Sequence, residues 1–129
     1  MKKSSINLLY VIFGIMLLAV SITLISCAKK TEYGQKTTIS ADSPKLQVKD
    51  ILSSEQYVDK EVVLEGRITL ECGSGCWFNL EDGTGKVYVD LLPSNFAIPQ
   101  WVGKTVIVQG KVIKEKGDIK LIGKSVKQK

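Results

Sequence analysis

The sequence contains no histidine among its 129 residues. This absence excludes Ser-His-Asp and Cys-His nucleophile systems, histidine-based zinc sites and axial histidine ligation of haem. Methionine is nearly as scarce, because Met1 and Met16 both fall within the first 26 residues and no thioether follows them. No motif in the chain selects an enzymatic reaction. We therefore expect a protein that is not an enzyme and that carries no cofactor.

The first 27 residues have the pattern of an export signal. Lys2 and Lys3 precede an apolar run from Ile6 to Ile25, as in a signal peptide. The run closes on Leu24-Ile25-Ser26-Cys27, which resembles the lipobox of bacterial lipoproteins. The resemblance implies that residues 1–26 are removed and that Cys27 carries acyl chains such as palmitate. The alternative is an uncleaved transmembrane anchor, since about 20 apolar residues can just span a bilayer.

Either interpretation places the rest of the chain outside the cytoplasm, in the cell envelope, because basic residues before an apolar segment stay inside. Residues 27–46 are rich in Lys, Thr, Ser and Gln and show no apolar periodicity. They are predicted to form the lipidated cysteine and a flexible tether. Residues 47–129 are predicted to form one folded domain near the lower size limit for independent stability.

Charge is unevenly distributed along this domain. Loss of Lys2 and Lys3 would lower the formal net charge from +5 to +3, which is too mild to indicate nucleic-acid binding. The segment from Glu55 to Asp90 holds eight acids and three bases, whereas Lys104 to Lys129 holds eight bases and two acids. The domain is therefore expected to be bipolar. Its basic side is either a solvated face or a patch for an anionic partner such as lipid headgroups.

Apolar and polar residues alternate from Val62 onward, which predicts strands with one buried face. In Val62–Leu70 the predicted inward residues are Val62, Leu64, Gly66, Ile68 and Leu70, and Gly66 suggests a bend or bulge. Further strands are predicted at 77–80, 86–91, 105–113 and 119–126. A short helix or irregular lead-in precedes them near Val48–Tyr57, and Pro93 and Pro99 argue against a long helix in the crossover at 92–103.

Three strands, an irregular crossover and two more strands follow the order of a small closed barrel. The segments VVLEGRI, CWFNLEDGTGKVYVDL and VGKTVIVQGKV resemble the OB-fold, and Cys72 with Gly75-Cys76-Trp77-Phe78 resembles a group of small exported bacterial OB-type proteins. The resemblance implies an all-β, five-stranded OB-fold-like barrel. Trp101 and Phe96 in the crossover are expected to plug one end of this barrel.

Cys72 and Cys76 are the first candidates for chemistry, because they flank Gly-Ser-Gly in a loop that can bring two sulfurs together. Outside the cytoplasm, neighbouring cysteines usually oxidise, so a disulfide that staples the loop is the first interpretation. Two thiolates also suit Cu(I), which gives a soft-metal site as the second. A redox-active pair is the third, although Cys-x3-Cys differs from the Cys-x-x-Cys motif of thioredoxin-like proteins. Free thiols are the fourth.

The second candidate site is the outer face of the second and third strands, where OB-folds usually bind ligands. The expected residues are Trp77, Asn79, Lys86 and Tyr88, with Asp90 beside them. The two rings either stack on a base or a sugar or simply cover apolar surface. Nearby acids disfavour phosphates, so nucleic acid is not the expected partner, and a small ligand, a glycan or an envelope protein is expected. Glu81 and Asp82 are assigned to a turn, not to acid–base catalysis.

Overall fold

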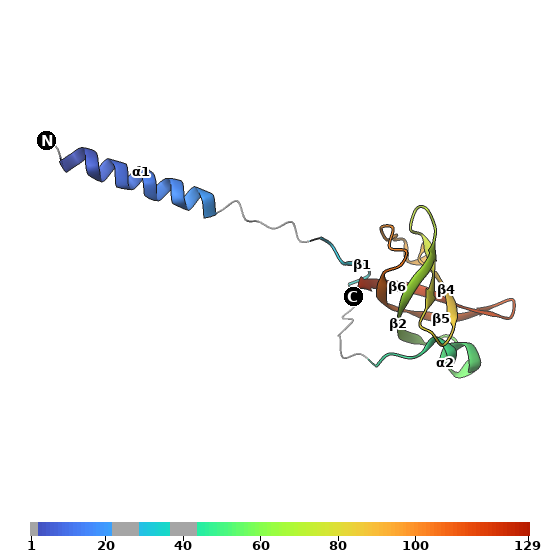
Figure 1. Cartoon of the computed structure of the whole chain (residues 1–129). Coiled ribbons are helices and arrows are strands. Elements are labelled where there is room, and N and C mark those ends of the chain that lie inside the picture. Colours follow the sequence, from blue (N-terminus) through green and yellow to red (C-terminus); the bar gives the residue numbers. More distant parts are fainter. Residues whose placement is uncertain (1–2, 22–28, 37–43) are drawn as a thin grey trace.

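The computed structural model describes residues 3–21, 29–36 and 44–129, and strands form most of the part that follows residue 60 (Figure 1). Two short 3₁₀ turns lie at Glu55–Tyr57 and Leu92–Ser94. Among the described helices, none combines the length and the hydropathy needed to cross a membrane. Cys27 lies outside the described residues. The helices are α1 (Lys3–Ser21) and α2 (Val48–Ser53), and the strands are β1 (Glu32–Gly34), β2 (Glu61–Glu71), β3 (Trp77–Glu81), β4 (Lys86–Asp90), β5 (Thr105–Glu115) and β6 (Asp118–Gln128).

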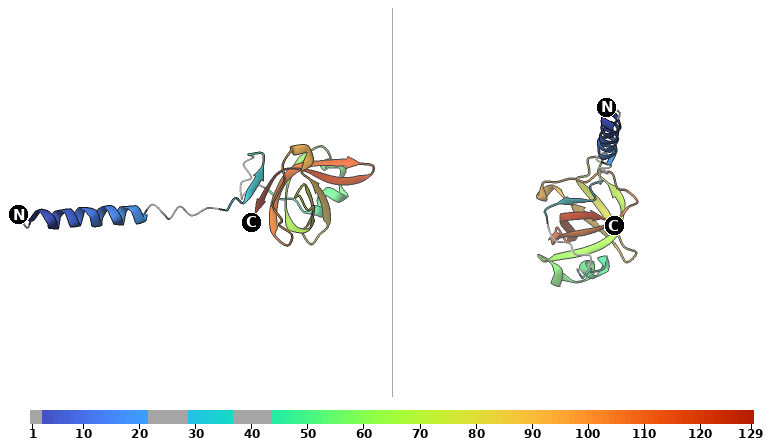
Figure 2. Two further views of the ribbon diagram at one scale, coloured as in Figure 1. Left: turned by 90° about the horizontal axis from the view of Figure 1, so that it is seen from above. Right: turned by 90° about the vertical axis from the view of Figure 1, so that its left-hand side faces the viewer.

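Strands β2 to β6 close into a ring (Figure 2). The hydrogen-bonded order is β6-β4-β3-β2-β5, and β5 pairs again with β6 to complete the barrel. All of these pairings are antiparallel except β4 with β6, which run parallel. The crossover between β4 and β5 makes this parallel pair possible. The prediction of an all-β, five-stranded OB-fold-like barrel is therefore confirmed.

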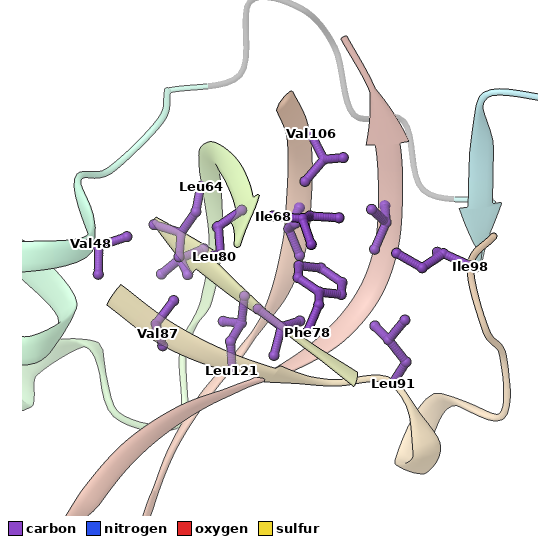
Figure 3. Close-up of a cluster of buried hydrophobic side chains, with 14 of the residues drawn as sticks. Val48, Leu64, Ile68, Phe78, Leu80, Val87, Leu91, Ile98, Val106 and Leu121 are labelled. Atoms are coloured by element: carbon purple, nitrogen blue, oxygen red, sulfur yellow. The ribbon is translucent and has the colours of Figure 1, made fainter. Parts of the chain in front are cut away.

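Alternating apolar side chains fill the barrel (Figure 3). Phe78 and Leu80 of β3 are fully buried in the middle of the cluster. Val48 of α2 lies at one end of it, and Ile98 of the crossover lies at the other, as Figure 3 shows. Burial of these side chains is the main favourable contribution to folding, at roughly 25 cal/mol per Å² of apolar surface. The two ends of the barrel are thus closed by segments outside the strands.

Strand β2 departs from the predicted alternation near its end. Ile68 pairs with Leu80, and Leu70 pairs with Asn79, which is adjacent to Leu80 in β3. Two residues of β2 thus correspond to one step along β3, so Thr69 is an extra residue in β2. Such a bulge turns the following side chain to the other face. Leu70 is consequently 53% exposed, and its assignment to the core was wrong. The bulge is also not at Gly66, where close packing of β3 requires glycine because a Cβ would lie 2.7 Å from the Glu81 carbonyl oxygen.

Part of the segment assigned to a tether contacts the barrel. The three residues of β1 pair with the end of β6, with Tyr33 opposite Val126. The ring of Tyr33 packs edge-on against Trp101, which is 3% exposed and closes this end of the core, and Phe96 packs against the same core. Trp101 therefore contributes to the core as expected, and Phe96 contacts the core from a partly buried position. Residues 37–43 of the same segment lie outside the described residues.

Candidate functional site

The structure brings the predicted face residues together on the outside of β3 and β4. Asn79 lies directly opposite Tyr88, Trp77 opposite Asp90, and Glu81 opposite Lys86. Their neighbours along each strand, including Phe78 and Val89, point into the core. This separation follows from the two-residue period of a strand, which sends successive side chains to opposite faces. The outer surface formed by Trp77, Asn79, Lys86, Tyr88 and Asp90 is termed the ligand face.

Two aromatic rings form the centre of the ligand face. The centroids of Trp77 and Tyr88 are 5.4 Å apart, and the ring planes are tilted by 31°. Tyr88 is 37% exposed and Trp77 is half-buried. Burial raises the pKa of the Tyr88 hydroxyl, and the nearby charge of Asp90 adds to the effect. The pair therefore offers a neutral, partly exposed aromatic surface on which a flat ligand can stack.

The dithiol loop, Cys72–Cys76, adjoins the ligand face and runs directly into Trp77. The two cysteines are free in the structure, and their sulfurs are 2.8 Å apart, with Cys76 donating to Cys72. The Ser74 hydroxyl contacts both sulfurs, at 3.2 Å from Cys72 and 3.5 Å from Cys76. Both cysteines are half-buried. The loop thus brings the two sulfurs together, as the Gly-Ser-Gly spacing predicted, and leaves both cysteines partly accessible to solvent.

Hydrogen bonds to distant segments fix the backbone of the dithiol loop. Gly75 has a φ of +71° and its carbonyl oxygen accepts from the Ile98 N–H at 3.1 Å. A Cβ on Gly75 would lie 1.8 Å from the Ile98 carbonyl oxygen, so no other residue fits there. The Gln100 side-chain amide donates to the carbonyl oxygens of Cys72 and Gly73. The crossover after β4 therefore supports the loop between β2 and β3.

Hydrogen bonding also changes the acidity of one thiol. The Cys76 thiol, followed by Ser74, hydrogen-bonds to the Cys72 sulfur and stabilises its thiolate, which lowers the pKa of Cys72 from 9.0 to about 6. The negative charge of the cysteine pair in turn contributes to the raised pKa of Tyr88. The dithiol loop and the ligand face are therefore electrostatically coupled. Charges on the cysteine pair and on Asp90 affect the ionisation of the Tyr88 hydroxyl.

Glu71, one of the acids near the ligand face, has a structural role that the sequence did not indicate. One of its carboxylate oxygens accepts from the Trp101 backbone N–H at 2.7 Å. The other is buried and accepts no hydrogen bond of good geometry from the described residues. Burial raises the pKa of Glu71, while the backbone N–H groups of Trp101 and Val102 oppose the rise. Glu71 joins the end of β2 to the crossover, immediately before Cys72.

Asp82 has the structural role predicted for it. Its carboxylate accepts from the N–H and the hydroxyl of Thr84, which closes the turn between β3 and β4. The other oxygen accepts from the Val48 N–H at the start of α2. Asp82 therefore ties the turn to α2 and faces away from Glu81, whose carboxylate lies 3.8 Å from the Lys86 amine.

A basic hollow lies where the chain reaches the barrel from its N-terminal side. It encloses about 370 Å³, and lysines contribute to its lining from three parts of the sequence. The lysines are Lys29, Lys104 and Lys129. Lys129 is paired with Glu65 at 2.6 Å, while Lys30 lies 4.7 Å from the centroid of the Tyr33 ring. Positive charge thus gathers in a hollow to which Lys29, two residues after Cys27 in sequence, also contributes.

Clusters of three or more His, Cys, Asp or Glu side chains that could hold a metal ion do not occur in residues 3–21, 29–36 and 44–129. Cys72 and Cys76 are a pair, and the loop adds the Ser74 hydroxyl to their two sulfurs.

The comparisons with known proteins show similarity of fold only. No family model and no curated protein match the chain. Among solved structures, the hypothetical protein YgiW from E. coli is 21% identical with a TM-score of 0.50, and the match covers 67% of this chain and 90% of YgiW. A putative aspartyl-tRNA synthetase from Leishmania major Friedlin is 19% identical with a TM-score of 0.53 over 74% of this chain. The match spans 22% of the synthetase. These similarities support a small OB-fold-like domain.

Proposed function

We propose that the chain is an extracytoplasmic lipoprotein whose OB-fold-like barrel binds a ligand and is not an enzyme. The observation that carries the proposal is the partly exposed Trp77–Tyr88 pair at the centre of the ligand face. In OB-folds, the outer surface of the second and third barrel strands binds oligonucleotides and oligosaccharides. In this barrel those strands are β3 and β4.

The charges around the pair favour an uncharged ligand. Asp90 belongs to the ligand face, and Glu81 lies at its edge opposite Lys86. Carboxylates repel the phosphates on which nucleic-acid affinity depends. A pyranose ring can instead stack on an aromatic side chain and accept hydrogen bonds from amides such as that of Asn79. An envelope oligosaccharide is therefore the ligand class that we propose.

The proposed membrane anchor is supported by two features. The sequence Leu24-Ile25-Ser26-Cys27 resembles a lipobox, and acyl chains on Cys27 would hold the protein on a membrane surface. The basic hollow begins at Lys29, two residues after Cys27. Lysines at this position are suited to contact anionic headgroups, because each basic residue near such a surface contributes about 1 kcal/mol.

The anchor is tested by intact mass spectrometry of the protein extracted from membranes. The expected mass is that of residues 27–129 plus acyl chains, and Cys27→Ala is expected to leave residues 1–26 attached and no lipid. An unmodified N-terminus in the natural chain would show that the first segment is retained, and the lipoprotein proposal would be rejected.

The ligand face is tested with two probes, a short chito-oligosaccharide and an oligodeoxythymidylate. The full-length protein in detergent is titrated with each while tryptophan fluorescence is recorded, because Trp77 is partly exposed and Trp101 is buried. We expect saturable binding of the sugar that depends only weakly on salt. The double variant Trp77→Ala/Tyr88→Ala should not bind the sugar, as measured by calorimetry. Leu92→Ala, an exposed apolar substitution outside the ligand face, is the control and should bind normally.

Two results would contradict this assignment. Sugar binding that survives the double variant would place the ligand elsewhere on the barrel. Strong binding of the oligodeoxythymidylate that weakens steeply with salt would show that the barrel recognises a polyanion.

A further inference from the structure

The glycan-binding proposal gives the dithiol loop no role, yet its geometry is specific. Two sulfurs from residues four apart in sequence lie 2.8 Å from each other, and both side chains are accessible to solvent in part. The loop contains two glycines, Gly73 and Gly75, and Gly75 has no room for a side chain. A loop that holds two thiols side by side can form a disulfide or chelate a soft metal ion.

The donor set restricts what the pair can bind. Thiolates are soft ligands that select Cu(I), zinc and iron–sulfur clusters among biological metals. Structural zinc sites take four ligands, usually Cys or His, and iron–sulfur clusters are held by four cysteines. This loop contributes two sulfurs and one serine hydroxyl. Two thiolates suffice for a monovalent ion of the Cu(I) type, which is stable in linear coordination.

We propose that Cys72 and Cys76 form a two-coordinate site for a soft monovalent metal ion, with Cu(I) as the ion that fits best. The proposal is independent of the glycan-binding function and of the identity of that ligand. The site lies at the edge of the ligand face, because Cys76 directly precedes Trp77 in β3.

The loop can open to admit the ion. The sulfurs must move apart, since a metal ion takes the place of the hydrogen bond between them. The backbone around them is fixed by the Cys72 N–H, which donates to the Trp77 carbonyl oxygen, and by the Leu91 N–H, which donates to the Cys76 carbonyl oxygen. Gly73 and Ser74 between them are exposed, and a Cβ on Gly73 would meet nothing within 4 Å. Rotation of the two side chains is therefore sufficient.

The binding step involves no electron transfer. Each S–H bond that is present breaks and its proton goes to solvent, while two S–Cu(I) bonds form. The product is a dithiolate–Cu(I) unit with a net charge of −1. Ser74, whose hydroxyl already contacts both sulfurs, is placed to donate a hydrogen bond to one of the thiolates.

The test uses the full-length chain carrying Cys27→Ala, so that Cys72 and Cys76 are the thiols present. The protein is extracted in detergent, reduced under inert gas and titrated with Cu(I) against the coloured chelator bathocuproine disulfonate. We expect one Cu(I) per chain to be withdrawn from the chelator, and X-ray absorption to show two sulfur neighbours. Cys72→Ser and Cys76→Ser should each lose this binding, with circular dichroism used to verify that the barrel is folded.

Gly73→Ala is the matched control in the same loop and should keep one Cu(I) per chain, because it leaves both sulfurs and the Ser74 hydroxyl in place and its Cβ would meet nothing within 4 Å. Trp77→Ala/Tyr88→Ala should also keep it, which separates this site from the ligand face. Three results would overturn the proposal. These are failure of the reduced chain to compete with the chelator, Cu(I) binding by either cysteine variant that equals binding by the chain with both cysteines, and a Cys72–Cys76 disulfide in the isolated protein that is reduced only after unfolding.

Discussion

The ring of Tyr33 stands edge-on to the indole of Trp101, with the ring centroids 5.3 Å apart and the planes at 77°. Through this contact, a residue of the N-terminal segment covers the side chain that closes one end of the barrel. Edge-to-face pairs stabilise proteins by about 0.5–1.5 kcal/mol beyond the area that they bury. The N-terminal segment is therefore part of the folded domain at this point.

Tyr33→Ala should lower the free energy of unfolding by about 1–3 kcal/mol, because it removes both the ring pair and partly buried apolar area. Tyr33→Phe keeps the ring and should stay within about 0.5 kcal/mol of the natural protein. Urea denaturation followed by circular dichroism measures both. Equal midpoints for Tyr33→Ala and the natural chain would show that β1 does not stabilise the barrel.

Gly75→Ala and Gly73→Ala form a matched pair in the dithiol loop. Gly75 has a positive φ and no space for a Cβ, so alanine there should cost at least about 2 kcal/mol of stability through backbone strain and displacement of Ile98. Gly73 has open space around it, and alanine should change stability by less than about 0.5 kcal/mol. Thermal unfolding of the two variants distinguishes them. Similar losses at both positions would contradict the close contact between Gly75 and Ile98.

Cys72 should react as a thiolate at a pH well below the range in which cysteine thiols usually ionise. In the reduced Cys27→Ala chain, its alkylation rate by iodoacetamide should rise with pH and reach half of its maximum near the pKa of about 6, not near 9. Cys76→Ala removes the strongest hydrogen bond to Cys72 and should move the midpoint upward, while Ser74→Ala should move it less. Peptide mapping by mass spectrometry gives the rate at Cys72. A midpoint near 9 in the natural loop would contradict the hydrogen bonding described.

Glu71 and Glu65 should affect the pH dependence of stability in opposite directions. Burial raises the pKa of Glu71 above 4.5, so folding favours its protonated form and the natural chain loses this stabilisation as the pH rises through the folded pKa. Glu71→Gln cannot ionise and keeps an acceptor for the Trp101 N–H. Its free energy of unfolding, relative to the natural chain, should therefore increase as the pH rises above 4.5.

Glu65 provides the contrast. Hydrogen bonds from Lys129 and then Lys45 lower its pKa, so its contribution is present above 4.5 and is lost as the pH falls through the lowered value. Glu65→Gln should consequently become less stable, relative to the natural chain, as the pH rises. Urea titrations at a series of pH values measure both differences. The same slope for the two variants would refute the opposite environments assigned to these carboxyls.

The barrel could be predicted from the sequence because its signal is local. Val87 and Val89 alternate with Lys86, Tyr88 and Asp90, and this period fixes both the strand and the two faces. The ligand face followed directly from that alternation. Leu70 was misplaced because a bulge adds one residue to β2 without any mark in the composition, and the period then continues on the opposite face.

The supports of the site could not be predicted, because their partners are far apart in sequence. Gln100 donates to the carbonyl oxygens of Cys72 and Gly73, and Glu71 accepts from the Trp101 N–H. Each contact depends on the path of the crossover, which has no periodicity. Strand β1 could not be predicted either, because a strand of three residues is too short to show an alternating pattern. The sequence identified the candidate groups, but the fold determined what holds them in place.

The pairing of β1 with β6 limits the distance between the barrel and Cys27. Glu32 is five residues beyond Cys27, and an extended chain covers at most about 3.6 Å per residue. With the lipid on Cys27 as proposed, the barrel would be held within about 18 Å of its anchor, not at the end of a long spacer. Confinement to such a thin layer raises the effective concentration of any partner in the same membrane. A weak intrinsic affinity would then be sufficient for recognition at the membrane surface.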